Sequence, residues 1–405
     1  MRSHGPTRAL LAVVTGVLVA VAGLPLSGAG ASGSPRSLDL RLVARLPAVL
    51  RPYATAPVGG AEIVGARLWI AFEGLSTHAT RGPCLNVTAC AKPLPPPTHG
   101  LIAVFSTTTG RVVRTIATGT LPRLTAADGN IWVSTARSFP RDSSLSPDMA
   151  AVPAIGGGWV REYDGRSGRL LGSYKVPFPT DIAAAGKRAY VLSLVPGRPY
   201  EGGSLLELEG GHVRTVAEIR GVTYGPMTVC DGRVAVATTI PSKATPSSSH
   251  GPAGGLLTVV SLGSHRQRSE PAPTVSWTTC AGRRIALVRV APHGRAITLY
   301  DGAWPPRPVA SLPGGTTSIV AAPGERGLWL MLSTGTSRTS PYVVKRYEGG
   351  RLANVPVHPP VGDLQADTWS LAARGPKLFY LSGGGLYSLT ASYKTGDGLP
   401  GSLGS

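Results

Sequence analysis

The sequence predicts an all-β protein, a seven-bladed β-propeller of four-stranded antiparallel blades that is closed by the N-terminal strand. Three observations predict it: a recurring short phrase, paired hairpins between its copies, and strand-like segments at both chain ends. In each copy of the phrase, small residues precede a glycine turn and a β-branched or aromatic triplet follows it. The turn glycines are Gly65, Gly129, Gly186, Gly232, Gly282, Gly324 and Gly375. Spacings of about 43 to 63 residues between copies are typical of a radial repeat.

Each copy of the phrase is followed, after a loop, by a second pair of alternating runs. Leu101–Phe105 turns at Gly110 into Arg111–Ile116, and Val160–Asp164 turns through glycine-containing residues into Arg169–Tyr174. Short alternating runs separated by Gly, Asp and Ser are hairpin signals, and two hairpins per repeat give a four-stranded blade.

The two ends of the chain supply the predicted closure. Strand-like sequence ends near Thr390, and a Gly-rich tail, residues 391–405, follows it. From Leu38 onward, leucines alternate with polar residues. We therefore expect residues 38–46 to form the outer strand of the last blade, so that the propeller occupies residues 38–390 and has no open seam.

The first residues resemble an export signal. Arg2 and Arg8 give a basic start, Ala9–Leu26 is apolar, and Ala29-Gly30-Ala31 fits the small-x-small cleavage rule. We expect residues 1–31 to be a signal peptide, with an uncleaved N-terminal anchor as the alternative. The mature protein is then extracellular or cell-wall associated and monomeric, with no stable transmembrane span.

Four cysteines in an oxidising compartment predict two disulfides. Cys84 and Cys90 lie in one loop and are expected to pair. Cys230 and Cys280 each stand two residues before a turn glycine in consecutive repeats. They form a bridge if their Cα atoms approach within about 7 Å, and otherwise remain as two buried thiols.

The formal net charge is +19, from 40 basic and 21 acidic residues. One interpretation is attraction to polyanions such as cell-wall polymers; the other is the arginine bias of a GC-rich genome. Because the arginines are scattered without aromatic interleaving, no nucleic acid partner is expected. The partner is unknown; a cell-wall polymer, a saccharide and a surface protein all remain open.

The stretch from Val104 to Ile116, continuing to Leu121-Pro122-Arg123 and Gly129-Asn130-Ile131-Trp132-Val133, resembles the YncE-like (YVTN-repeat) bacterial β-propellers. The resemblance implies a seven-bladed ring outside the cytoplasm. It implies no single activity.

Virginiamycin-B-lyase-like propellers share Gly-x-x-Trp phrases, and that resemblance would imply a metal-assisted lyase with His and Glu in the channel. The histidines of this chain lie in loops, turns or the signal rather than beside such acids.

Long insertions occur at Glu73–Gly100, Ala136–Gly158 and Ile240–Gly255. All three fall between the second and third strands of a blade, so we expect them on one face of the disc. Such loops commonly carry function, although neutral insertion explains them equally well. The acids Glu207 and Glu209 alternate on one strand, and we expect them to be solvated.

Residues just before each inner strand should meet around the channel mouth. These candidate ligand-binding residues are Glu62, Arg123, Asp181, Tyr224, Trp277 and Trp369. Aromatic faces with a few polar groups suit saccharides, whereas packing of the tryptophans between blades is the alternative. The sequence contains no recognisable catalytic or metal-binding motif, so we assign no catalytic residue, metal or cofactor. The sequence therefore favours a non-catalytic binding scaffold, with a channel-mouth enzyme as the alternative.

Overall fold

A computed structural model gives the fold of the protein. It describes residues 37–53, 58–73, 99–136, 157–194, 202–221, 227–239, 255–272, 275–281, 284–291, 294–300, 307–311, 318–323, 327–333, 342–348, 351–358, 371–374, 377–382 and 385–392. These residues are almost entirely β-strand, with one 3-10 turn, η1 (Arg51–Tyr53). Within this part of the chain, no helix is long and apolar enough to cross a membrane. The predicted all-β class is confirmed.

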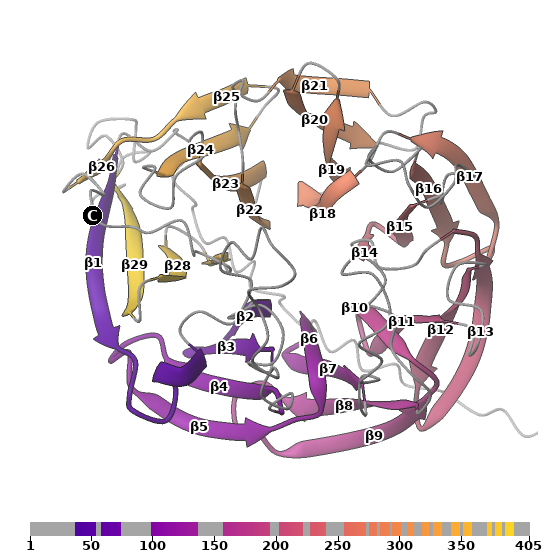
Figure 1. The fold of residues 1–405 in the computed structure, drawn as a ribbon, viewed down its shortest axis with the longest axis horizontal. Helices are drawn as coiled ribbons and strands as arrows, with labels where there is room; N and C mark the ends of the chain where they lie inside the picture. Colours follow the sequence, from indigo (N-terminus) through magenta and orange to yellow (C-terminus); the bar gives the residue numbers. More distant parts are fainter. Residues whose placement is uncertain are drawn as a thin grey trace, which may run out of the picture.

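The strands form six four-stranded sheets and one five-stranded sheet, arranged around a common centre (Figure 1). The first three four-stranded sheets are β2 (Val58–Val64), β3 (Arg67–Phe72), β4 (Leu101–Ser106), β5 (Val112–Ala117); β6 (Thr120–Ala127), β7 (Asn130–Ala136), β8 (Gly158–Asp164), β9 (Leu170–Val176); and β10 (Pro179–Ala185), β11 (Arg188–Leu194), β12 (Gly203–Glu209), β13 (His212–Ile219). Neighbouring strands in them pair antiparallel, as expected for propeller blades.

The next three four-stranded sheets repeat the same order. They are β14 (Met227–Cys230), β15 (Arg233–Thr239), β16 (Gly255–Ser261), β17 (Gln267–Ala272); β18 (Val275–Ala281), β19 (Arg284–Ala291), β20 (Gly294–Tyr300), β21 (Arg307–Ser311); and β22 (Ser318–Pro323), β23 (Gly327–Ser333), β24 (Tyr342–Glu348), β25 (Arg351–Asn354). The prediction of a β-propeller with four-stranded antiparallel blades is thus confirmed.

The five-stranded sheet contains both ends of the described chain. Its order is β26 (Val357–His358), β1 (Ser37–Arg45), β29 (Gly385–Ser392), β28 (Lys377–Ser382), β27 (Leu371–Arg374). Strand β1 pairs antiparallel with β29 along its length. Residues 38–46 are predicted to form the outer strand, and this prediction is wrong in one respect: β26 lies outside β1. Strand β26 pairs parallel to β1, and the Leu38 N–H donates to Pro356 O over 2.7 Å. Strand β29 also continues to Ser392, past the predicted tail boundary at residue 391.

Tight turns explain why a glycine recurs in the copies of the phrase whose turns the structure describes. In the β6–β7 hairpin, Asp128 and Gly129 have φ of 48° and 81°; Asp231 and Gly232, in the β14–β15 hairpin, have 46° and 70°. Positive φ at both central residues matches the twist of a two-residue hairpin, and Asp-Gly tolerates it. The turn chemistry therefore sets the register of the inner strands.

The core lies between adjacent sheets rather than at one central point. Trp69, Trp132 and Trp329, from the second strands of three sheets, are fully buried. Trp69 packs with Ile131 and Tyr163 of the next sheet. Such inter-sheet packing holds the blades of a propeller together.

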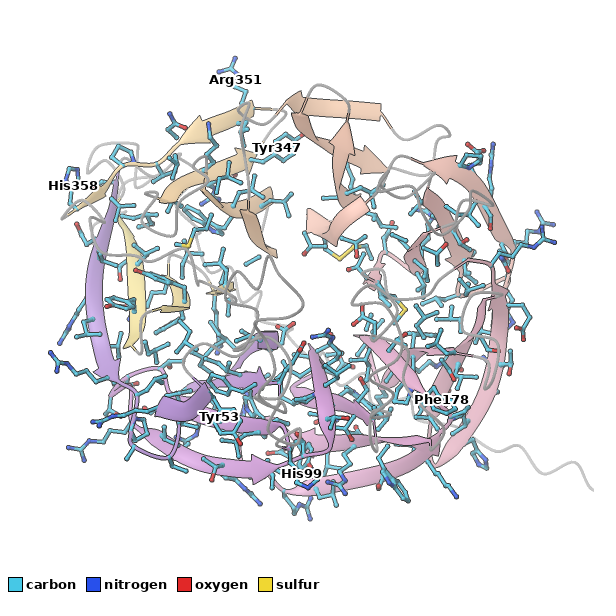
Figure 2. All side chains as sticks on the ribbon, in the orientation of Figure 1. Tyr53, His99, Phe178, Tyr347, Arg351 and His358 are labelled. Carbon is cyan, nitrogen blue, oxygen red and sulfur yellow. A yellow bond between two sulfur atoms is a disulfide. The ribbon has the colours of Figure 1, made fainter. Side chains whose placement is uncertain are left out.

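The strand directions define two faces. Strands β2, β6 and β8 all run toward the turns at residues 65–66, 128–129 and 165–169, and we call this side the short-turn face. Strands β3, β7 and β15 run the opposite way, toward the long insertions, and we call that side the long-loop face. Tyr53 and His99 are labelled in Figure 2, and the Tyr53 hydroxyl donates to His99 O over 3.2 Å.

Candidate functional site

Three of the six predicted mouth residues have described side chains: Glu62 in β2, Arg123 in β6 and Asp181 in β10. Trp277 has a described backbone position in β18, opposite Val288, but its side chain lies outside the described part. Tyr224 and Trp369 lie outside the described residues altogether, as do Cys84 and Cys90. The aromatic half of the predicted site therefore stays a prediction.

Arg123 and Glu73 form an ion pair that joins two sheets at the long-loop face. Glu73 directly follows β3, and its carboxylate accepts a hydrogen bond from Arg123 Nη1. The Glu73 side chain is 7% exposed, whereas that of Arg123 is 31% exposed. A buried carboxylate thus holds a guanidinium that still reaches solvent, which is a preorganised arrangement for contact with a ligand.

Asp181, in the third sheet, extends the Glu73–Arg123 pair into a row of three charged residues. Its carboxylate also accepts a hydrogen bond from the fourth sheet. Its Oδ1 accepts the N–H of Ile182 over 2.9 Å, and its Oδ2 accepts the N–H of Met227, the first residue of β14, over 2.8 Å. Burial raises the pKa of Asp181 to about 6, although the charge of Arg123 and these two N–H groups act to lower it. Asp181 therefore titrates close to neutral pH.

Glu62 does not belong to this row. It is two residues from the end of β2, whereas Arg123 and Asp181 are each four residues from the ends of β6 and β10. Glu62 lies opposite Trp69 in the register, closer to the short-turn face. Desolvation by the surrounding protein raises its pKa to about 8, even though the residue keeps part of its surface exposed. Glu62 is thus largely protonated at neutral pH.

Glu73 is the member of the charged row that sequence reasoning missed. It stands at the start of the long insertion at residues 73–100, where no spacing or motif distinguishes it from other loop acids. The pairing depends on the adjacency of β3 and β6, which only the arrangement of the sheets decides.

The described residues contain no group of three or more His, Cys, Asp or Glu positioned to hold a metal ion. Figure 2 shows His358 at the outer edge of the molecule and His99 below the first sheet, both away from the centre. The described part of the mouth thus offers carboxylates and a guanidinium as its polar groups.

The acids Glu207 and Glu209 differ from the expectation that both are solvated. Glu207 is 2% exposed and pairs with Arg214, with 2.8 Å between Oε1 and Nη2. Glu209 is exposed and pairs with Arg188 over 2.8 Å. A nearly fully buried carboxylate requires a partner, and Arg214 on the neighbouring strand supplies it.

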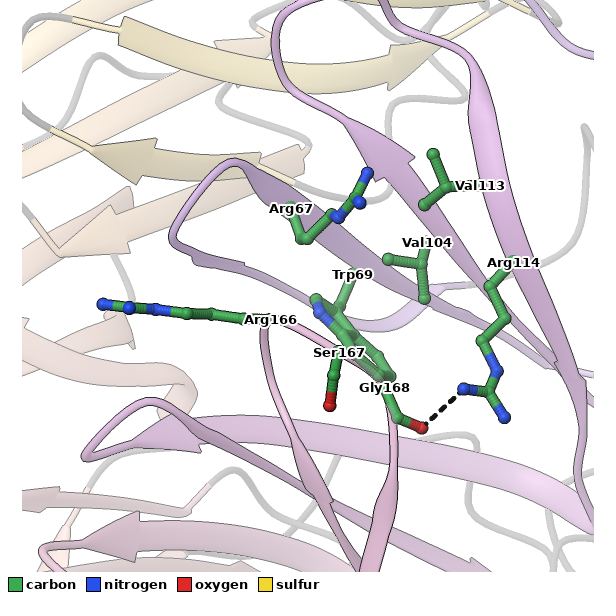
Figure 3. Close-up of a pocket in the computed structure, with 8 residues that line it drawn as sticks. All are labelled: Arg67, Trp69, Val104, Val113, Arg114, Arg166, Ser167 and Gly168. Atoms are coloured by element: carbon green, nitrogen blue, oxygen red, sulfur yellow. Dashed lines mark hydrogen bonds between the residues drawn. The ribbon is translucent and has the colours of Figure 1, made fainter.

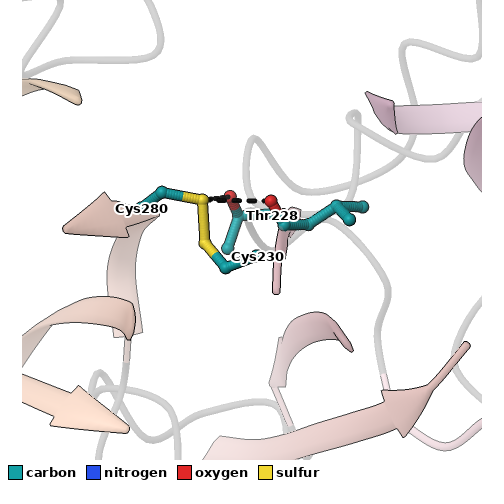
Figure 4. The surroundings of a disulfide bond; sticks show 4 residues. Thr228, Cys230 and Cys280 are labelled. Carbon is teal, nitrogen blue, oxygen red and sulfur yellow. Dashed lines mark hydrogen bonds between the residues drawn. A yellow bond between two sulfur atoms is a disulfide. The ribbon is translucent and has the colours of Figure 1, made fainter. Parts of the chain in front are cut away.

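Cys230 and Cys280 form a disulfide with 5.8 Å between their Cα atoms (Figure 4). The bridge joins β14 to β18 of the next sheet. The two positions are not equivalent in register, because Cys230 lies opposite Arg233 at the hairpin end, whereas Cys280 lies opposite Ile285, one pair further from the turn. The bridged alternative is confirmed, and the described residues contain no free cysteine.

No protein-family model matches the sequence, and comparison with curated proteins gives no match. Solved structures do resemble the fold. One is hydrazine synthase of Kuenenia stuttgartiensis, with a TM-score of 0.52 and 12% identity over 83% of this chain and 96% of that one. Another is the Dos1 propeller, with a TM-score of 0.50 and 10% identity over 89% of this chain and 96% of that one. At such low identity these likenesses show the propeller fold alone.

Proposed function

We propose that this protein is a non-catalytic binding scaffold whose ligand contacts the mouth of the channel at the long-loop face. The observation that carries the proposal is the row Glu73, Arg123 and Asp181, supplied by three consecutive sheets. Arg123 is held by a buried partner and remains partly exposed. A ligand with hydroxyl or carboxylate groups, such as a saccharide or a cell-wall polymer, matches these groups.

The test is binding of purified protein to a glycan array, followed by fluorescence titration of the ligands found. We expect Arg123→Gln to weaken binding by about tenfold or more, because a hydrogen bond to a charged group contributes about 1.5 to 3 kcal/mol. Arg51→Gln, in the exposed η1 turn, is the control and should bind as the wild type does. If the wild type binds no glycan on the array and shows no fluorescence change in titration, the proposal is refuted.

A channel-mouth enzyme is the second candidate, and one observation favours it. Burial raises the pKa of Asp181, a member of the charged row, to about 6, and perturbed carboxyl groups of this kind occur at acid-base sites. Turnover that is lost in Asp181→Asn, or tightly bound metal in the purified protein, would favour the enzyme. Stable capture of a partner without turnover would favour the scaffold.

We further propose that the ring has seven blades, that β1 closes it and that the chain is exported. The pairing of β1 with β29 and the contact of β2 with β27 support closure. The Cys230–Cys280 disulfide is compatible with an extracellular location. The resemblance to YncE-like propellers supports both seven blades and export.

N-terminal sequencing of protein recovered from culture medium tests export. We expect a mature chain that begins near residue 32, and an intact Met1 in a membrane fraction would contradict export.

A further inference from the structure

Two sheets carry arginines at matching positions but differ in how these are neutralised. Arg67 is the first residue of β3, and Arg188 is the first residue of β11. Arg188 forms an ion pair with Glu209 of β12, with 2.8 Å between Nε and Oε2. In the register of β3 and β4, the residue directly opposite Arg67 is Ser106. Arg67 therefore faces a hydroxyl where its counterpart has a carboxylate.

A second pair of arginines shows the same contrast. Arg214 of β13 lies opposite Glu207 and is neutralised by it. Arg114 of β5 lies opposite Val104. Glu207 and Val104 are equivalent, because they face Tyr190 and Trp69, the third residues of β11 and β3. The sheet of β2–β5 thus keeps both arginines and lacks both carboxylates.

These two arginines line a pocket of about 330 Å³ between the sheet of β2–β5 and the next one (Figure 3). The turn between β8 and β9 adds a third cation, Arg166. The remaining lining residues are Trp69, Val104, Val113, Ser167 and Gly168. No carboxylate is among them, and no ion pair of Arg67, Arg114 or Arg166 is present in the described part of the chain. The pocket therefore has a local excess of positive charge.

Several hydrogen bonds fix the walls of the pocket. Arg114 Nη1 donates to Gly168 O over 2.8 Å, and Trp69 Nε1 donates to Gly165 O over 2.9 Å. Asp164, the acid on the same turn, already accepts the Ser167 N–H at 2.6 Å. A Cβ at Gly168, where φ is +73°, would lie 2.9 Å from Arg114 Nη1. The turn thus docks closely on the neighbouring sheet and holds Ser167 at the pocket edge.

We propose that this pocket binds an oxyanion group with two or more negative charges, of the phosphoryl class. The anion would supply the negative charge that Glu207 and Glu209 supply in the sheet of β10–β13. Guanidinium groups bind phosphate oxygens in bidentate fashion. The Ser167 hydroxyl is already hydrogen-bonded to Asp164, so the three arginines are the donors that the pocket offers. Arg166 extends away from Arg67 in Figure 3, so its side chain must turn inward to contact the anion.

The pocket is large enough to hold the group together with part of the molecule that carries it. The group belongs either to a small free phosphate or to a phosphate-bearing polymer. The site opens near the short-turn face, whereas Arg123 lies at the long-loop face. Failure of either proposal therefore leaves the other intact.

The experiment is calorimetric titration of the full chain with inorganic phosphate and, separately, with long-chain polyphosphate, at constant ionic strength in chloride buffer. We expect Arg67→Gln to weaken binding by about tenfold or more, because a charge-assisted hydrogen bond is lost. Ser106→Glu should do the same while keeping all three arginines, because it restores the missing carboxylate. Arg188→Gln is the matched control, because it removes one positive charge from the sheet of β10–β13, where Glu209 neutralises that arginine. Its affinity for both probes should stay within about twofold of the wild type.

Each outcome decides the proposal. Binding counts as pocket-dependent when Arg67→Gln or Ser106→Glu weakens it and Arg188→Gln does not. Pocket-dependent binding of both probes supports the proposal and shows that free phosphate suffices. Pocket-dependent binding of polyphosphate alone supports the proposal, with a phosphate-bearing polymer as the ligand. No binding of either probe overturns it. Equal weakening by Arg188→Gln and Arg67→Gln also overturns it, because net charge rather than the pocket would then govern affinity. Ser106→Glu keeps the test valid if Arg67→Gln fails to fold.

Discussion

The sheet of β14–β17 is joined to its two neighbours in different ways. Toward β10–β13, the Asp181 carboxylate accepts the Met227 N–H over 2.8 Å near the long-loop face. Toward β18–β21, the Cys230–Cys280 disulfide forms the link. Apolar packing is common to both junctions. Apolar packing thus holds the ring together at both junctions, whereas one junction adds a titratable carboxyl and the other a bond that reductant can break.

The N-terminal strand β1 forms a third kind of junction through strand pairing and apolar packing, and it carries the largest expected effect. Leu38 of β1 is fully buried, whereas Leu42 of the same strand is 44% exposed. We expect Leu38→Ala to lower the free energy of unfolding by about 2 to 5 kcal/mol, because it leaves a cavity. Leu42→Ala should change it by about 0.5 kcal/mol or less. Denaturant titration measures both; equal effects would mean that β1 does not hold the sheet together.

The disulfide junction should show the next largest effect. We expect the double variant Cys230→Ala and Cys280→Ala to lose about 2 to 4 kcal/mol of stability, because the cross-link no longer restricts the unfolded chain. Reductant should destabilise the wild type by a similar amount or more, and the double variant by less, because only the predicted Cys84–Cys90 bridge is left in it. A double variant as sensitive to reductant as the wild type would show that another bridge carries the effect.

The Asp181 junction should make stability depend on pH. Burial raises the pKa of Asp181 from 3.8 to about 6, so the folded protein binds more protons than the unfolded chain between these values. The free energy of unfolding therefore falls as pH rises from 3.8 to about 6 and stays lower above it. Asp181→Asn, which keeps an oxygen to accept the Met227 N–H, should flatten this part of the profile measured by denaturant titration at several pH values.

Glu62→Gln is the parallel variant for the other raised carboxyl. The pKa of Glu62 is raised from 4.5 to about 8 by desolvation, so its contribution to stability is lost as pH rises through that window. The wild type should therefore lose stability between about pH 6 and pH 8 relative to Glu62→Gln. If both variants kept the wild-type profile, other groups would control the pH dependence.

The smallest expected effect is a difference in stability loss between substitutions of two buried tryptophans, Trp69 and Trp132, at equivalent positions. Trp69 Nε1 donates to Gly165 O, in the turn of the next sheet, whereas Trp132 Nε1 has no hydrogen-bond partner among the described residues. Both phenylalanine variants lose packing, but only Trp69→Phe also loses a hydrogen bond. We expect it to be about 1 kcal/mol more destabilising than Trp132→Phe in denaturant titration. A larger loss for Trp132→Phe would contradict this interpretation.

Some features could be predicted from the sequence because they depend on local chemistry. Asp128-Gly129 and Asp231-Gly232 specify tight hairpin turns, since few other pairs adopt positive φ twice. Alternation from Leu38 onward specified a strand at the N-terminal end, now seen as β1. The contacts of the candidate site could not be predicted in this way. Glu73 meets Arg123 across two sheets, and no spacing in the sequence encodes that distance.

The sequence by itself determined the all-β class, the hairpin turns and the excess of arginine, because these follow from residue type and short-range order. The tertiary structure alone decided which charges meet. Arg188 and Arg67 are each the first residue of the second strand of their sheets. Only the structure shows that Glu209 neutralises Arg188, whereas Ser106 faces Arg67. Charge pairing depends on distances of a few ångströms between side chains far apart in sequence, and those distances are fixed only when the sheets pack.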